Sequence, residues 1–145
     1  MHHANVKEEV DPARSRLMSR VGPKDTKPEM IVRRLLHAAG YRYRLHVKSL
    51  PGSPDLVFPS RRAVIMVHGC FWHRHEGCRK ATTPKTRVEF WKNKFTANQA
   101  RDERQLAELR ELGWRTLVVW ECWTEAPNEL ERRLVDFLGE PGGAV

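Results

Sequence analysis

The segment 68–78, HGCFWHRHEGC, constrains the folding of this chain more than any other part of the sequence. It holds two cysteines and three histidines, and the remaining cysteine, Cys122, lies far downstream. Thiolates and imidazoles in a tetrahedral set are ligands that zinc prefers, and structural zinc sites close with four protein ligands. The candidate ligands are Cys70, His73, His75, Cys78 and Cys122. Spacing alone does not choose between the two histidines, but the pattern predicts a structural Zn²⁺ that fixes this loop to the core.

The number of cysteines also favours a metal site over a disulfide framework. Three thiols cannot all pair within one chain, and the N-terminal sequence MHHANVKEEVDPARSR lacks the apolar core of a secretory signal. A single buried cysteine is often only a small apolar residue, whereas three thiols interleaved with histidines indicate coordination. No run approaches the roughly 20 apolar residues of a membrane helix, so we expect a cytoplasmic protein without a membrane anchor.

The charge of the chain indicates the kind of partner that it binds. The 145 residues include 26 Lys and Arg against 18 Asp and Glu, which gives a formal net charge of +8 at pH 7. Such a surplus favours a polyanion, above all nucleic acid, although it does not determine a fold. The length suits one compact domain. We expect that domain over residues 25–138, preceded by a flexible basic arm over 1–24 and followed by a disordered tail over 139–145.

Capping residues and helical spacing predict three helices. Thr26 and Glu29 form a capping box that opens the first helix, and Gly40 ends it. A long helix is expected over about 88–112. A second capping box, Asn128 with Glu131, predicts a last helix that runs to 138.

Between these helices, alternating or continuous apolar runs predict strands over 41–47, 55–58, 63–67 and 116–120, with a hairpin turn at 59–62. The order is therefore α-β-β-β-α-β-α. A strand–helix–strand crossover implies at least one parallel pair, with helices on both faces of the sheet. The sequence predicts an α/β fold with a central mixed sheet.

An acidic residue and two histidines are expected to meet at one edge of this sheet. Asp55 opens the second strand, and His68 follows the next strand, so both side chains emerge at the same edge. His73 can join them if the zinc loop folds back. A carboxylate with imidazoles can hold Mg²⁺ and activate water for phosphodiester cleavage. A Pro-Asp pair is usually no more than a turn, but here buried strands, basic charge and histidines converge on it.

Other polar and aromatic residues have two interpretations each. Glu29 either completes the helix cap or serves as a further acid, and Asp102 on the long helix is expected to be solvated. Phe71 and Trp72 lie between candidate ligands and are expected to be exposed, because a loop fixed by metal offers them few core neighbours. Trp91, beside two lysines, either packs in the core or inserts between base pairs with them.

Taken together, these residues resemble the very short patch repair endonucleases over positions 13 to 122. The most specific block is HGCFWH at 68–73. The matching residues are Arg14-Ser15, Met18, Asp25-Thr26, Ser49-Leu50-Pro51-Gly52, Pro54-Asp55, His68-Gly69-Cys70-Phe71-Trp72-His73, Thr86-Arg87, Glu89-Phe90-Trp91, Leu112-Gly113-Trp114-Arg115 and Val119-Trp120-Glu121-Cys122.

The resemblance implies a restriction-endonuclease-like fold and a magnesium-dependent nick. The expected nick lies on the 5′ side of the thymine in a T:G pair, a mismatch that arises when 5-methylcytosine is deaminated. The expected setting is the bacterial cytoplasm, at the nucleoid. The expected partners are duplex DNA with this mismatch and a mismatch-repair matchmaker protein, and we expect a monomer.

The resemblance also implies roles for individual residues. Asp55 would hold Mg²⁺ together with the main-chain carbonyl of Val67, while His68 and His73 would act around the scissile phosphate and Glu29 at the edge of the site. The implied ligands of structural Zn²⁺ are Cys70, His75, Cys78 and Cys122. The implied DNA contacts are intercalating Phe71, Trp72 and Trp91, with Asn98 near the mismatch.

Two departures from the family pattern leave other functions open. Val67 stands where the family often has threonine, and the pair Glu76-Gly77 makes the loop before Cys78 one residue longer. The chain also lacks the acid-x-lysine pair usual in the wider nuclease superfamily. Its absence fits a variant of the chemistry that uses histidines. The alternatives are a non-catalytic DNA-binding module stapled by zinc and a nuclease of the same fold without mismatch preference.

Overall fold

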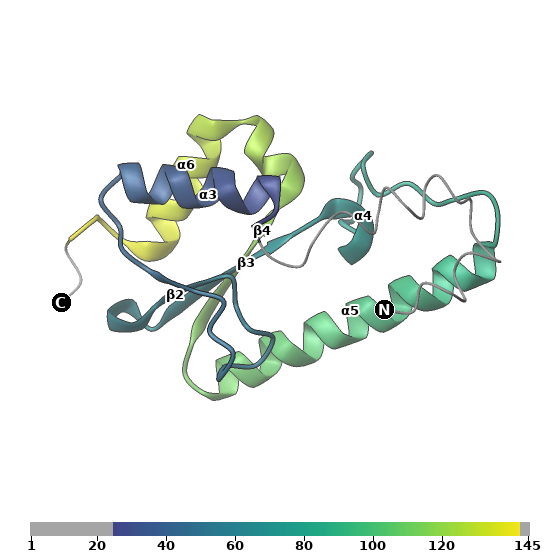
Figure 1. The fold of residues 1–145 in the computed structure, drawn as a ribbon, viewed down its shortest axis with the longest axis horizontal. Helices are drawn as coiled ribbons and strands as arrows, with labels where there is room; N and C mark the ends of the chain where they lie inside the picture. The colour runs from purple at the N-terminus through teal and green to yellow at the C-terminus, as the bar shows by residue number, and fades with distance from the viewer. Residues whose placement is uncertain (1–24, 143–145) are drawn as a thin grey trace.

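The computed structural model describes residues 25–142. The arm expected over 1–24 and the last three residues of the expected tail lie outside the described residues. Within the described part, a four-stranded sheet is flanked by helices on both faces (Figure 1). None of the helices in this part is both long and apolar enough to cross a membrane.

The sheet has the strand order β1-β2-β3-β4. Its strands are β1 (Arg44–Leu45), β2 (Leu56–Phe58), β3 (Ala63–His68) and β4 (Arg115–Trp120). The first two pairings are antiparallel and the pairing of β3 with β4 is parallel, with His68 opposite Trp120. The parallel pair, which the sequence predicted, is confirmed, and the long helix α5 (Val88–Glu111) makes the crossover between its strands.

Helices cover the two faces of the sheet in different ways. Helix α3 (Lys27–Ala38) and helix α6 (Pro127–Leu138) lie together on one face, whereas α5 runs along the other (Figure 1). Since side chains alternate along a strand, β2 and β3 bury residues on both faces. The side chains packed in one core with α3 and α6 include Leu56, Phe58, Ala63 and Ile65, and those packed with Leu109 of α5 are Val57, Val64 and Met66. This two-sided burial explains the continuous apolar run of β3.

Strands β3 and β4 are each one residue longer than expected, at His68 and at Arg115, and three other segments differ from the expectation. Strand β1 has two residues instead of seven, because Tyr41 is buried with its hydroxyl donating to the Gly139 carbonyl, and His46 has a positive φ of 48°. Strand β2 begins at Leu56, one residue later than expected. The segment expected as a simple hairpin turn is a 3-10 turn, Pro59–Arg61, that ends on a left-handed Arg62.

The expected N-cap of the first capping box is confirmed, although the Glu29 carboxylate accepts from the Asp25 amide and not from that of Thr26, and the second capping box is wrong. Thr26 is the N-cap of α3 and accepts a hydrogen bond from the Glu29 amide. Helix α6 instead begins at Pro127 after Ala126, which makes no side-chain cap, so Asn128 lies inside the helix. Proline suits this position because its fixed φ fits a first helical turn and its missing N–H is not needed there. Two short elements were not expected, namely α4 (Cys70–His73) and the 3-10 turn η2 (Glu121–Glu125).

Candidate functional site

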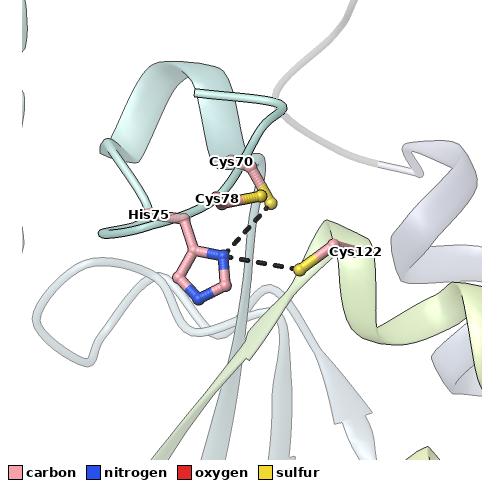
Figure 2. A group of neighbouring side chains, drawn as sticks. All are labelled: Cys70, His75, Cys78 and Cys122. Atoms are coloured by element: carbon pink, nitrogen blue, oxygen red, sulfur yellow. Dashed lines mark hydrogen bonds between the residues drawn. The ribbon is translucent and has the colours of Figure 1, made fainter. Parts of the chain in front are cut away.

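Four sulfur and nitrogen ligands converge in what we call the Cys3His cluster, made of Cys70, His75, Cys78 and Cys122 (Figure 2). Their ligand atoms all lie within 4.8 Å of one another. The His75 Nδ1 atom lies 3.6 Å from the Cys70 sulfur and 3.4 Å from the Cys122 sulfur. Of the two histidines that spacing left open, the structure brings His75 into this cluster.

The local fold explains how segment 68–78 gathers three of these ligands. Helix α4 makes one turn, and Arg74 then adopts a left-handed conformation with φ 54°, which turns the chain back so that the His75 amide donates to the Cys70 carbonyl. The fourth ligand, Cys122, comes from η2, and Glu121 beside it accepts a hydrogen bond from the Cys70 amide at 3.2 Å. The loop is thereby attached to the end of the sheet.

The donor chemistry of the Cys3His cluster fits a tetrahedral metal ion. Zinc bonds of about 2.3 Å to sulfur and about 2.0 Å to nitrogen separate sulfur and nitrogen ligands by roughly 3.5 Å. The two distances from His75 to sulfur, 3.6 and 3.4 Å, match this separation. Burial raises the pKa of the Cys70 thiol to about 12, and a coordinated cation favours the thiolate that this environment disfavours. The cluster could therefore hold a metal ion.

Asp55 occupies the sheet edge where it was expected. Its side chain is only 19% exposed, and Oδ2 accepts a hydrogen bond of 2.7 Å from the Val67 amide. Burial raises the pKa of this carboxyl to about 6, against the lowering effect of the Val67 N–H, and the nearby Glu29 carboxylate raises it further. The Val67 side chain packs on the apolar core, so its main chain is what faces Asp55.

Glu29 belongs to the cap of α3, and its carboxylate also lies close to Asp55. Its amide donates to Thr26 in the helix cap, while its carboxylate, in a residue that is 1% exposed, accepts three further hydrogen bonds. Oε1 accepts from the Asp25 amide at 3.2 Å, and Oε2 accepts from Arg33 at 3.4 Å and from His46 Nε2 at 2.8 Å. The cap of α3 thus holds a buried carboxylate close to Asp55.

The sequence reasoning missed His46. Its Nε2 atom also lies 4.0 Å from Asp55 Oδ1, so the imidazole stands between the two carboxylates. Its amide donates to the Asp55 carbonyl at 3.1 Å, which continues the antiparallel β1–β2 pairing by one residue. Residues directly opposite in such a pair have neighbouring side chains. The position of His46 opposite Asp55 could have been predicted from the sequence. That prediction requires knowing that the loop 47–54 joins two paired strands.

His68 and His73 stack face to face, with ring centroids 3.9 Å apart. Burial, followed by the neighbouring His73, lowers the pKa of His68 to about 4. A positive charge on His73 in turn lowers the pKa of Asp55, so His73 lies within electrostatic range of this carboxyl. The expectation that Asp102 is solvated is wrong, because its side chain is 12% exposed and its Oδ2 lies 2.5 Å from His73 Nδ1. Segment 68–78 folds back onto α5 and brings these two residues together.

The aromatic residues predicted to contact DNA form a packed group with α5. Phe71 is 8% exposed and Trp91 is 2% exposed, and together with Phe95 they form a small core of their own. The expectation that Phe71 is exposed is therefore wrong, because α4 packs against α5 and supplies the neighbours that an isolated loop would lack. Trp72 is only partly buried, and the side chain of buried Asn98 donates to its carbonyl at 3.2 Å.

Comparison with known proteins finds consistent similarities. The family model described as DNA mismatch endonuclease Vsr matches residues 8–80. The Type II nicking enzyme V.XorIIP of Xanthomonas oryzae pv. oryzae is 54% identical over 130 residues, 89% of this chain and 95% of that protein. The DNA mismatch endonuclease Vsr of Escherichia coli is 46% identical over 128 residues, 88% of this chain and 81% of that protein. The Type II nicking enzyme V.NmeAIP of Neisseria meningitidis is 42% identical over 132 residues, 91% of this chain and 94% of that protein.

Proposed function

The chain belongs to the DNA mismatch endonuclease Vsr family, and from this membership we propose that it nicks one strand of duplex DNA on the 5′ side of the thymine in a T:G mismatch. The nick would start the very short patch repair of deaminated 5-methylcytosine. The observation that carries the proposal is the edge of the sheet where Asp55 lies beside Glu29 and interacts with His73. His68 and His73 at this edge belong to segment 68–78, which also carries three of the four ligands of the Cys3His cluster.

We propose that Asp55 and the Val67 carbonyl hold Mg²⁺. The residues suit a hard cation, because the Asp55 carboxylate is buried, has a second carboxylate nearby and accepts its one described hydrogen bond from a neutral amide. When bound, Mg²⁺ would polarise the scissile phosphate and stabilise charge on its oxygens. Since valine offers the same main-chain carbonyl as threonine, its presence at position 67 is compatible with this role.

The chain's own residues would then move the proton of the attacking water. The Nδ1–H of His73 donates to Asp102, which leaves Nε2 free to accept a proton. His68 stays neutral near pH 7 because the pKa is about 4, so it can stack on His73 without repelling the imidazolium that forms. Glu29 would orient groups at the edge of the site.

We propose that the Cys3His cluster binds structural Zn²⁺ and so keeps α4 against the sheet. This helix carries His73 and the two aromatic residues that precede it. Phe71, Trp72 and Trp91 would enter the duplex beside the mismatch. Since two of these rings are buried, their entry requires the aromatic group to open, and the partly buried Trp72 would leave first. Asn98 would steer that opening through its hydrogen bond to the Trp72 carbonyl.

The mixed α/β sheet with helices on both faces is compatible with a restriction-endonuclease-like fold, organised as a single nuclease domain over 25–138. We propose that it works as a monomer in the bacterial cytoplasm, at the nucleoid, together with a mismatch-repair matchmaker protein.

A strand-specific nicking assay tests the function. Wild type with Mg²⁺ should nick a T:G duplex on the thymine strand, leave the T:A duplex intact and stop when the metal is chelated. Asp55→Ala should bind the T:G duplex and fail to nick it. Equal cutting of T:G and T:A duplexes would indicate a nuclease without mismatch preference, and binding without nicking over a panel of mismatches and divalent metals would indicate a DNA-binding module.

A further inference from the structure

We propose that His46 is a positioning residue of the nicking site, where its imidazole holds the Glu29 carboxylate against Asp55. The proposal rests on the proposed function and adds a residue to it. The imidazole spans the gap between the two acids, with Nε2 2.8 Å from Glu29 Oε2 and 4.0 Å from Asp55 Oδ1. The side chain is 14% exposed, so it is enclosed between α3 and the edge of the sheet.

The backbone of His46 supports a role beyond packing. With φ 48°, it lies in the left-handed region that side chains other than glycine adopt at a cost. Such strained residues persist where the surroundings hold them, and they gather at functional sites. Here the amide bond to the Asp55 carbonyl, 3.1 Å long, fixes the residue opposite Asp55. Strand β1 ends at this point, and its exposed residues Arg44 and Leu45 offer little burial that would require such a conformation.

The hydrogen bond from His46 is the shortest that Glu29 accepts among the described residues. The other side-chain donor to the same oxygen is Arg33, at 3.4 Å, and it also donates to Asp25 at 2.7 Å. Arg33 therefore draws the carboxylate toward the exposed start of α3, whereas His46 draws it toward Asp55. Without the imidazole, the Glu29 carboxylate would turn toward Arg33 and Asp25, and Asp55 would lose its partner at the edge of the site.

Two substitutions separate positioning from folding. His46→Ala removes the donor, and His46→Gln keeps an N–H donor on a side chain of similar reach. Both keep a β-carbon, so both bear the same backbone strain. The matched control is His37→Ala, which removes an exposed histidine from the same helix as Glu29.

In the T:G nicking assay, His46→Ala should lower kcat roughly ten- to hundred-fold, the size expected when a hydrogen bond to a charged group is lost. KM and the melting temperature should stay close to wild type, His46→Gln should recover most of the rate, and His37→Ala should match wild type. The carboxyl carbon signal of Glu29 in NMR spectra should shift in the alanine variant and return toward wild type in the glutamine variant.

Each result bears on one proposal. A wild-type kcat in His46→Ala, or a loss that tracks a lowered melting temperature and is not restored by glutamine, would overturn the role of His46 while T:G nicking by wild type stands. If wild type does not nick, the proposed function fails, and an unchanged Glu29 signal in His46→Ala then overturns the hydrogen-bond assignment independently of activity.

Discussion

Segment 68–78 contributes to two groups of ionisable side chains whose polar atoms find their partners in different ways. One is the Cys3His cluster, and the other is the acidic edge, made of Glu29, His46, Asp55, His68, His73 and Asp102. The ligand atoms of the Cys3His cluster all lie within 4.8 Å of one another. At the acidic edge, the ligand atoms gather in two smaller sets instead of one, and in each set a histidine is paired with a carboxylate, His73 with Asp102 and His46 with Glu29. Convergence suits one metal ion that satisfies all four ligands at once, whereas pairing fixes the orientation of each group and leaves other atoms free for chemistry.

Trp120 connects the two groups. The His75 ring stacks on this indole with centroids 4.2 Å apart, while the His68 ring meets it edge-on at 5.4 Å. A displacement of the Cys3His cluster would therefore reach His68 and the stacked His73 through direct contacts. The comparison predicts that substitutions in the acidic edge change the reaction more than the fold, and that substitutions in the cluster change both.

Asp55→Asn should give the largest effect. Asparagine keeps the shape and can accept from the Val67 amide, but it removes the proposed magnesium ligand, so nicking should fall at least about 1,000-fold. The same change should stabilise the metal-free protein by about 1–3 kcal/mol near pH 8, because burial raises the pKa of Asp55 from 3.8 to about 6 and the charged form is disfavoured. Nicking assays and thermal melts measure both.

The effect of Asp55→Asn on stability should depend on pH. The folded protein binds an extra proton on Asp55 between pH 3.8 and about 6, so this group's contribution to stability is largest at low pH and is lost as the pH rises through this window. The free energy of unfolding of Asp55→Asn should exceed that of wild type most above pH 6 and by little below pH 4. A variant that is less stable than wild type at pH 8 would contradict the assigned burial of charge.

Cys122→Ser should give the second largest effect, and it tests the Cys3His cluster. Loss of the fourth ligand should lower the zinc content and cost about 3 kcal/mol or more of stability, since binding at structural zinc sites contributes on the order of 10 kcal/mol. Nicking should fall together with stability. Elemental analysis and melts measure this, with Glu125→Gln in the same 3-10 turn as the control because its ion pair is exposed and weak. Unchanged zinc content would remove Cys122 from the ligand set.

Asp102→Asn should have a smaller effect, confined to the reaction. An amide does not hold the His73 imidazolium as a carboxylate does, so kcat should fall about 10- to 100-fold while the melting temperature changes little. The exposed neighbour Glu103 provides the control Glu103→Gln. A single-turnover nicking rate equal to wild type would mean that the pair only fastens α4 to α5.

The sequence predicted the elements whose cause is local. Thr26 capped its helix, the apolar run of β3 predicted a strand buried on both faces, and the loop cysteines predicted the Cys3His cluster. Spacing left His73 and His75 open because both are within reach of a short loop. The left-handed conformation of Arg74, which no pattern in the sequence required, brings His75 and not His73 into the Cys3His cluster.

What the sequence did not predict depends on contacts between distant elements. Asp102 was expected in solvent because its own helix is highly charged, and only the return of α4 to α5 gives it His73 as a partner. The same packing buries Phe71, which was expected to be exposed. His46 was overlooked because its importance comes from the register across a loop, which periodicity within one strand does not reveal.

Gly77→Ala should give the smallest effect and sharpens the comparison within the loop itself. Gly77 has φ 73°, and a β-carbon there would meet no atom within 4 Å, so the change should cost about 1 kcal/mol through backbone strain alone. Zinc content and kcat should match wild type, because the extra loop residue then lies outside the Cys3His cluster. The control is Gly142→Ala, another glycine with positive φ, at 71°, and open surroundings. If Gly77→Ala instead releases zinc, the longer loop is part of the coordination geometry, and the cluster depends on a backbone conformation that its four ligands do not impose.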